Sequence, residues 1–475
     1  MIFKKIFIFI LWFFVNTTVF SQYKIDWVGS ANNVDTSWAP NINYHSSIYP
    51  NNLNASTDPF FELNKKMGIA PLVDIGLQLD GKLNFRSGIG IAIESKNFNK
   101  FYFRLGGVMG FEKKDSLFHS SGLYLSKSTF FIPTIRMGYK LNKFFDGQIG
   151  YDKNFIGDGC RSLLLSDYGK PYPFIRLNAK FWHIDYSIYY QFLSENVNNN
   201  YRSKFASTHY VSWNASRWWN FGIFESVIFQ PRDTMLYRGF DAEYLNPMVF
   251  FRPQEYSLGS ADNVILGLNA SYKWNRNVAY GQLIIDDFIV KQLVKRTGWW
   301  GNKIGWQLGW KFYNFYKKQL IKSRIEINAI RPFTYSHTNE LANYGNQGMP
   351  LAHPRGANNC ELLYESSSKI KKFYFKAILD IGYFGINIDN LNYGSNIYWS
   401  YNVRPFDFHW QIGEGIRNYF IVLNLHAAYN LLKEGNIYAF AETQFRFDSA
   451  IQGAKFKLIP TIGIRSYLWN DYRNY

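Results

Sequence analysis

Residues 130–182 read FFIPTIRMGYKLNKFFDGQIGYDKNFIGDGCRSLLLSDYGKPYPFIRLNAKFW. Residues 130–141 have the pattern of a β-strand, and a four-residue turn at 142–145 leads into a second strand that ends near Tyr151. Phe145, Gly147, Ile149 and Tyr151 share one face of the second strand, and Asp146, Gln148, Gly150 and Asp152 share the other. A long polar segment follows, and another strand opens at Phe174. This unit of strand, tight turn, strand and long connection recurs through most of the chain.

The same pattern predicts 18 strands along the chain. They are expected at 71–80, 83–95, 100–112, 130–141, 145–153, 173–182, 184–194, 204–215, 218–230, 264–274, 278–288, 304–314, 319–333, 361–369, 372–388, 418–431, 436–448 and 456–468. The alternation is cleanest in the strands at 100–112, 304–314, 319–333 and 456–468. Several of these strands carry charge on one face only, so each strand has an apolar and a polar side.

The composition narrows the fold class to a transmembrane β-barrel. Aromatic residues make up 20% of the 475 residues, with 15 Trp, 35 Tyr and 43 Phe, yet the mean hydropathy is only −0.24. Beyond the N-terminus no run reaches the roughly 18 apolar residues of a spanning helix. In an outer-membrane barrel the lipid face is apolar, the lumen is polar and aromatic girdles mark both interfaces. The alternative is a soluble all-β sandwich, which rarely exposes so much aromatic surface. Because charge at the lipid midplane costs about 2–4 kcal/mol, the charged faces are expected to point inward.

Connection lengths support the barrel independently. Short turns are predicted at 95–100, 142–145, 183–184, 215–218, 275–277, 315–319, 370–371 and 432–435. Long connections are predicted between them at 113–129, 154–172, 195–203, 231–263, 289–303, 334–360 and 389–417, with two short ones at 80–82 and 449–455. Short inner turns opposite long outer loops are typical of bacterial outer-membrane barrels. The predicted location is therefore the cell outer membrane.

The N-terminus predicts export. Residues 1–21 have the features of a signal peptide: Lys4 and Lys5, an apolar run at 6–15 and small residues before a cleavage site near Gln22. Without the signal, the formal net charge falls by its two lysines from +17 to +15. Residues 22–70 form a predicted N-terminal periplasmic segment with a short helix from Asp58 to Gly68, which is either a plug or a loosely ordered leader. The barrel is expected to occupy residues 71–475.

The only two cysteines are Cys160 and Cys360, and both fall in predicted outer connections on one side of the barrel. In an oxidising compartment they could form a disulfide, and two free thiols are the alternative. Neither cysteine has a nearby Cys or His at metal-ligand spacing, and no cofactor motif is present.

Four stretches of the chain resemble one protein family. They are residues 153–167, 244–255, 263–288 and 348–358. In this order they are similar to the Wzi-type capsule-assembly barrels of Bacteroidetes, which are often labelled RemB-like gliding-motility proteins. The resemblance implies an 18-stranded outer-membrane barrel that binds or organises surface polysaccharide in a lectin-like way, without catalysis. The N-terminal helical bundle of Wzi has only one short helix as a counterpart here, and no ligand residues carry over.

The predicted long connections hold residues suited to glycan binding. Sugars bind to flat aromatic faces, and Arg binds a carboxylate through two hydrogen bonds. The candidate ligands are Asp158 and Arg161; Tyr237, Arg238, Arg252 and Glu255; Trp299 and Trp300; and Trp399, Tyr401 and Arg404. For each residue taken singly, girdle anchoring or packing between loops is the alternative. The basic excess favours anionic polysaccharide or lipid phosphates as partners.

The predicted function is thus a non-catalytic barrel that binds surface or capsular polysaccharide and contacts outer-membrane lipid and lipopolysaccharide, with no nucleic-acid partner. Catalysis is not expected, because His209 and Ser212 lie three residues apart on a strand and face opposite sides. One alternative is a diffusion porin for small polar solutes, and another is a component of gliding or adhesion machinery. The charged luminal residues either line a pore or form cross-strand ion pairs, and no individual pairs are assigned. The basic set is Arg86, Arg104, Arg176, Lys180, Arg324 and Arg446, and the acidic set is Glu94, Glu112, Asp146, Glu326 and Glu442.

Overall fold

The computed structural model describes residues 67–98, 100–112, 123–126, 128–197, 200–231, 242–246, 262–316, 319–431, 437–450 and 453–466. The predicted signal peptide lies outside the described residues. So does the predicted N-terminal segment, apart from residues 67–70, which belong to the first strand. The helix predicted from Asp58 to Gly68 therefore falls outside as well, except for its last two residues, Met67 and Gly68, which are in that strand.

Within the described residues, the main sheet has 19 strands. One of them, β4 (Leu123–Tyr124), has two residues and pairs only with β5, which leaves 18 wall strands. These are β1 (Met67–Asp80), β2 (Lys82–Phe98), β3 (Phe101–Glu112), β5 (Thr129–Lys140), β6 (Phe145–Asp152), β7 (Tyr172–Phe181), β8 (Ile184–Val197), β9 (Asn200–Trp213), β10 (Trp219–Phe229), β11 (Asn263–Trp274), β12 (Asn277–Asp287), β13 (Lys303–Tyr316), β14 (Gln319–Ile330), β17 (Asn359–Ile370), β18 (Phe373–Ile386), β19 (Ile416–Asn430), β20 (Tyr438–Ala450) and β21 (Gly453–Arg465). Each predicted strand overlaps one of them.

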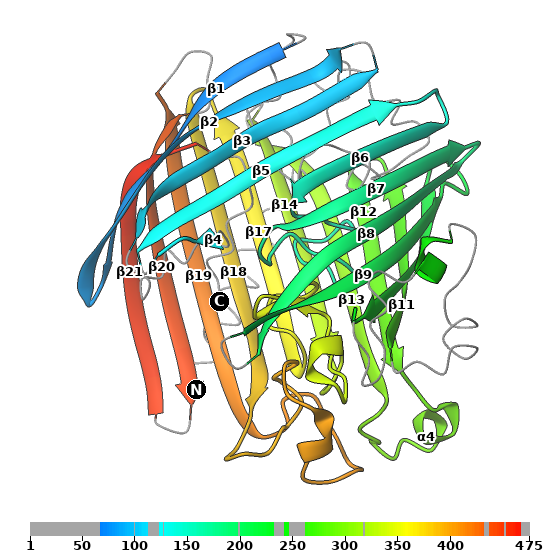
Figure 1. Cartoon of the computed structure of the whole chain (residues 1–475). Helices are drawn as coiled ribbons and strands as arrows, with labels where there is room; N and C mark the ends of the chain where they lie inside the picture. Colours follow the sequence, from blue (N-terminus) through cyan, green and yellow to red (C-terminus); the bar gives the residue numbers. More distant parts are fainter. Residues whose placement is uncertain are drawn as a thin grey trace.

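The sheet closes on itself as an antiparallel barrel (Figure 1). Each strand pairs with its neighbour in sequence, and β21 pairs with β1 from Thr461 opposite Gln78 to Arg465 opposite Asp74. Closure removes the free sheet edges that would otherwise leave backbone groups unpaired in lipid. The predicted fold class, an 18-stranded outer-membrane type of barrel, is confirmed. No helix within the described residues is long and apolar enough to cross a membrane.

The alternation of side chains sorts the two faces of the wall as predicted. In β6, Phe145 and Ile149 are exposed on the outside, whereas Gln148 and Asp152 are buried on the inside. In β13, Trp306, Leu308 and Trp310 are exposed, and Gln307 and Lys311 are buried. The outer face is therefore the apolar, lipid-facing side and the inner face carries the polar residues.

Connections at one end of the barrel are mostly long, and we call this the outer end; at the other end they are short. The outer connections carry the small elements η2 (Ala242–Leu245), α4 (Val290–Val294), η3 (Glu340–Ala342), η4 (Tyr401–Val403) and the hairpin of β15 (Gly345–Asn346) with β16 (Met349–Pro350). Several of them gather at the lower end of the barrel in Figure 1.

One predicted long connection is wrong. Residues 195–203 were expected to form a loop, but β8 runs to Val197 and β9 begins at Asn200. The pairing continues from Leu193 opposite Lys204 to Glu195 opposite Arg202, so opposite charges face each other across the hairpin. The Asn-rich, polar composition resembles a loop, although the side chains continue to alternate as in a strand.

The connection between β6 and β7 turns into the lumen. We call residues 153–171 the inner segment; most of them are buried. Its Ile156, Leu163, Leu164 and Leu165 form an apolar core with residues from two other outer connections, namely Tyr335, Tyr344, Leu351, Ala352, Ala357 and Ile397. This core fills part of the lumen and positions the polar contacts described next.

Candidate functional site

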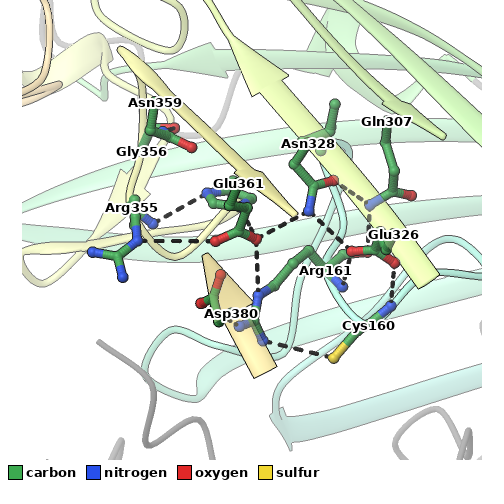
Figure 2. Close-up of polar contacts among 12 residues, drawn as sticks. Cys160, Arg161, Gln307, Glu326, Asn328, Arg355, Gly356, Asn359, Glu361 and Asp380 are labelled. Atoms are coloured by element: carbon green, nitrogen blue, oxygen red, sulfur yellow. Dashed lines mark hydrogen bonds and ion pairs between the residues drawn. The ribbon is translucent and has the colours of Figure 1, made fainter. Parts of the chain in front are cut away.

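The inner segment is bound to the wall through Glu326 of β14. The backbone N–H groups of Cys160 and Arg161 donate to the two Glu326 carboxylate oxygens at 2.7 and 3.0 Å (Figure 2). The Tyr280 hydroxyl of β12 donates to the same carboxylate at 2.7 Å, and Asn328 Nδ2 at 3.0 Å. A buried carboxylate is stable only when its oxygens accept hydrogen bonds, and here each oxygen accepts two.

A second carboxylate, Glu361 of β17, joins two of the stretches that resemble the Wzi-type family. Its Oε1 lies 3.3 Å from Arg161 Nε in the inner segment and 2.9 Å from His353 Nε2 in the 331–358 connection. Asn328 Nδ2 donates to Oε1 at 3.0 Å, and Arg355 Nε lies 3.9 Å from Oε2. Figure 2 shows Arg161, Asn328 and Arg355 arranged around Glu361. The stretches at 153–167 and 348–358 are therefore neighbours in space.

Two glutamines and two tyrosines bind the backbone of the same segment. Gln282 Oε1 accepts from Leu163 N at 2.8 Å, and Gln307 Nε2 donates to the Arg161 carbonyl at 3.0 Å. The hydroxyls of Tyr335 and Tyr344 donate to the carbonyls of Leu163 and Leu164 at 2.9 and 2.8 Å. These contacts satisfy the backbone groups of a segment that has no strand partner in the wall.

Asp158 and Arg161, both predicted glycan ligands, are buried in this network. Asp158 Oδ1 lies 3.3 Å from Lys311 Nζ, and Arg161 pairs with Glu361 and, at 3.7 Å, with Asp380. Burial raises the pKa of Asp158, and Lys311 partly offsets this effect. Both residues hold the inner segment through these contacts, and a role of either in glycan binding remains a prediction.

Four predicted ligands come together at the outer end. We call Trp299, Trp300, Tyr401 and Arg404 the outer aromatic cluster. Trp300 lies at its centre, with ring centroids 5.6 Å from Trp299 and 4.6 Å from Tyr401. The Arg404 guanidinium lies 4.1 Å over the Trp300 ring, and Arg404 Nε donates to Asp407 Oδ1 at 2.7 Å. Cation–π contact and ion pairing hold the cluster in one arrangement.

Backbone hydrogen bonds fix the two connections that supply the cluster. Trp300 N donates to the Asp407 carbonyl, His409 N to that of Thr297 and Trp410 N to that of Gly298, each at 2.9 Å. These bonds join the 288–302 connection to the 387–415 connection in the manner of a short ladder. The cluster is therefore a preorganised surface, which lowers the ordering cost of binding.

The remaining predicted ligands differ in their placement. Trp399 lies in the 387–415 connection and is exposed, but no ring contact joins it to the cluster. Tyr237, Arg238, Arg252 and Glu255 lie outside the described residues. Glycan contact by any of these five residues remains a prediction.

Sequence reasoning missed two exposed aromatic residues of the same surface. Phe406 and Phe408 are exposed in the 387–415 connection, and Phe406 stacks on the buried Trp410 at 4.3 Å between centroids. Phe406, Phe408 and Trp410 alternate with polar residues after Pro405. This alternation is visible in the sequence, but a search for aromatic residues close to an Arg does not detect it. Phe406 and Phe408 add exposed aromatic area to the 387–415 connection, which also supplies Tyr401 and Arg404, whereas Trp410 is buried.

Cys160 and Cys360 are both free thiols, so the structure has no disulfide between them. Cys360 lies in β17 and not in a loop, and this part of the prediction is wrong. Glu361 points into the lumen, so the adjacent Cys360 faces outward, whereas Cys160 sits beside Glu326 inside. The wall separates the two thiols. Burial raises the pKa of Cys160 to about 11, which keeps it a thiol at neutral pH.

Luminal charges form ion pairs, some of them within the predicted set. Arg86 pairs with Glu112 at 2.9 Å and Arg176 with Asp146 at 2.8 Å, and these four residues belong to that set. Other members of the set pair with residues outside it: Arg324 with Glu365, Arg446 with Asp448, and Glu442 with His426. Among the described residues there is no group of three His, Cys, Asp or Glu side chains that could hold a metal ion.

Comparison with solved structures places the fold among outer-membrane barrels. The chain is similar to Wzi, an outer-membrane protein involved in group 1 capsule assembly in Escherichia coli and a carbohydrate-binding β-barrel, with a TM-score of 0.56, 13% identity and 85% of each chain covered. It also matches OprD of Pseudomonas aeruginosa (TM-score 0.44, 10% identity, covering 85% of this chain and 96% of that one) and OccAB2 of Acinetobacter baumannii (0.46, 9%, 84% and 97%).

These likenesses concern the fold alone, because the identities are low. No protein-family model matches the sequence, and no curated protein matches it either. The expected structural similarity to Wzi is confirmed, and membership of a Bacteroidetes family remains a prediction. The chain is an outer-membrane type of β-barrel whose outer end carries a fixed aromatic surface.

Proposed function

We propose that this protein is a non-catalytic outer-membrane barrel that binds or organises surface polysaccharide. The observation that carries the proposal is the outer aromatic cluster, in which two connections far apart in the sequence are joined so that three aromatic rings and one Arg meet. Phe406 and Phe408 add exposed rings in the 387–415 connection. Wzi, which shares the fold, is a carbohydrate-binding barrel, and the proposal agrees with that property.

The chemistry of the cluster suits a sugar chain. The C–H faces of a pyranose ring pack on exposed aromatic rings, and hydroxyls bind to charged groups held in place. Arg404 and Asp407 are charged groups of this kind, and they form an ion pair at 2.7 Å. The ion pair orients their hydrogen-bond donors and acceptors before a ligand binds. Repeated weak contacts of this kind along a polymer add up to firm retention.

The filled lumen favours a polysaccharide-binding barrel over a pore through which solutes diffuse freely. The inner segment is buried, and side chains of β12, β13 and β14 bind it by several hydrogen bonds. A diffusion porin for small polar solutes remains the second candidate, because ion pairs such as those of Arg86 line the wall beside β1–β3. Single-channel recording of the purified full chain in a planar bilayer separates the two. A large, stable open current would favour the porin.

The proposal is tested in cells that lack the gene and carry either the natural protein or the variant Trp300→Ala/Tyr401→Ala. The matched control is Trp182→Ala, because Trp182 is 98% exposed in the turn between β7 and β8 at the opposite end. We expect the double variant to release polysaccharide into the medium while the control keeps it cell-bound. Equal retention by all three would contradict the proposal. Spreading of the deletion strain on agar tests the separate hypothesis of a role in gliding.

A further inference from the structure

The connection between β12 and β13 exposes a compact apolar face. Ile289, Val290, Leu293 and Val294 are between 45% and 75% exposed, and none of the residues of α4 is buried. Positions 289, 290, 293 and 294 fall on one side of a helical turn. An exposed cluster of four aliphatic side chains at the tip of a connection indicates a surface that contacts a membrane or another molecule.

Basic side chains occupy the other side of the same turn. Lys291 and Lys295 are one turn apart and exposed, and Arg296 follows directly. Acidic residues are absent from the first turn of α4. An apolar face bordered by lysines and arginines is the pattern of segments that lie in a membrane interface, where apolar groups enter the acyl boundary and cations bind anionic headgroups.

The position of α4 also fits the membrane interface. β12 ends at Asp287, so α4 begins three residues later and no more than about 11 Å from the end of the strand. On the lipid face near this end lie Ile285 of β12 and Ile304 and Trp306 of β13. Figure 1 shows α4 beyond the ends of β11 and β12, at the margin of the molecule. The apolar face therefore lies close along the chain to the lipid-facing residues at this end of the wall.

We infer that α4 lies in the headgroup layer of the outer leaflet, with its aliphatic face toward the acyl chains and Lys291, Lys295 and Arg296 on anionic lipid phosphates. This contact holds the outer aromatic cluster at a fixed height, because the chain passes directly from Arg296 to Thr297, whose carbonyl accepts from His409 N. The inference depends on the barrel being in a membrane and does not depend on polysaccharide binding.

The test uses the full chain with Cys160→Ser and Cys360→Ser, folded into phosphatidylcholine vesicles with or without phosphatidylglycerol. A fluorophore is attached at Val294→Cys or, as the control, at Glu340→Cys, since Glu340 is exposed in the 331–358 connection that also fills the lumen. Lipids with a spin label near the headgroup quench fluorophores in the leaflet, and iodide quenches those in water. Heat-dependent gel mobility checks that every variant is a folded barrel.

We expect spin-labelled lipid to quench the fluorophore at position 294 at least about twofold more than the one at 340, and iodide to quench it less. The triple change Lys291→Glu/Lys295→Glu/Arg296→Glu should reduce lipid quenching at 294 in vesicles with phosphatidylglycerol and leave it unchanged in those without. Equal quenching at both positions, or stronger iodide quenching at 294, would overturn the leaflet contact. Lipid quenching that does not respond to the triple change would overturn the role of the basic residues.

Discussion

Removing the carboxylate of Glu326 should release the inner segment without opening the wall. Glu326→Ala deletes the acceptor of two backbone N–H groups, those of Cys160 and Arg161, at 2.7 and 3.0 Å. Hydrogen bonds to a charged group contribute about 1.5–3 kcal/mol each, so the free energy that holds the segment should fall by about 3 kcal/mol or more. A change of this size raises the open fraction on the order of 100-fold.

The alkylation rate of Cys160 measures this opening. In a Cys360→Ser background Cys160 is the only thiol, and in the closed state it is half-buried with a pKa raised to about 11. In the closed state a thiol reagent should therefore react slowly, and the reaction rate should rise with the open population of the segment. We expect the rate with Glu326→Ala to exceed that of the background on the order of 100-fold.

The matched control is Glu365→Ala. Glu365 is also a buried luminal carboxylate, but its ion pairs are with Arg324 of β14 and Lys376 of β18, each at 2.8 Å, and its charge acts on Arg161 and Cys160 only through space. Its removal should leave the alkylation rate within a few-fold of the background. An unchanged rate with Glu326→Ala, or an equal increase with Glu365→Ala, would refute the reasoning that Glu326 holds the segment.

Two further predictions concern stability. A Cβ at Gly110 would overlap the Ser87 carbonyl oxygen, whereas a Cβ at Gly147 would make ordinary contacts with Leu177 Cδ2 at 3.8 Å and the Arg176 carbonyl oxygen at 4.0 Å. Gly110→Ala should therefore destabilise the barrel by about 2–3 kcal/mol in denaturant unfolding and Gly147→Ala by much less, and equal values would contradict this. Burial, with a smaller effect of Lys303, lowers the pKa of His337 to about 4, below its ordinary value of 6.5. Between these two values the unfolded chain binds a proton that the folded chain does not, so the free energy of unfolding should fall as the pH drops from about 6.5 to about 4. His337→Gln should make the free energy of unfolding depend less on pH in this range. An unchanged pH dependence would count against a neutral His337.

Strand positions and facing could be predicted from the sequence, because the alternation of lipid-facing and luminal residues is a local property. One such case is β6, in which the sequence predicts opposite faces for Phe145 and Ile149 and for Gln148 and Asp152. In the structure the first two are exposed and the last two are buried. The β8–β9 hairpin shows the limit of the method: Asn and Ser near its tip resemble a loop, while cross-strand pairs such as Glu195 opposite Arg202 extend the ladder.

The inner segment could not be predicted, because its partners are distant in sequence. Cys160 and Arg161 bind Glu326 and Glu361, which lie on strands 165 to 200 residues further along the chain. Its Gly-rich, polar composition is that of an exposed loop, and burial follows only once the wall supplies Gln282, Gln307 and two carboxylates. Residue type alone indicates that Asp158 and Arg161 can bind a sugar, but it does not show that their side chains point into the lumen.

The outer aromatic cluster was predictable by residue type but not as a cluster. Trp299 and Trp300 are about 100 residues from Tyr401 and Arg404 in the sequence, and nothing in it pairs the two connections. The three backbone hydrogen bonds between residues 297–300 and 407–410 do so in the fold.

Equilibrium binding of cell-surface polysaccharide to the purified, detergent-solubilised full chain tests the central claim most directly. Titration of the natural protein, of Trp300→Ala/Tyr401→Ala and of Trp182→Ala gives three dissociation constants under one condition. We predict that the double variant binds at least tenfold more weakly, or about 1.4 kcal/mol, while Trp182→Ala binds like the natural protein. Equal affinity of all three, or no binding by the natural protein, would contradict a glycan-holding role for the outer end of this barrel.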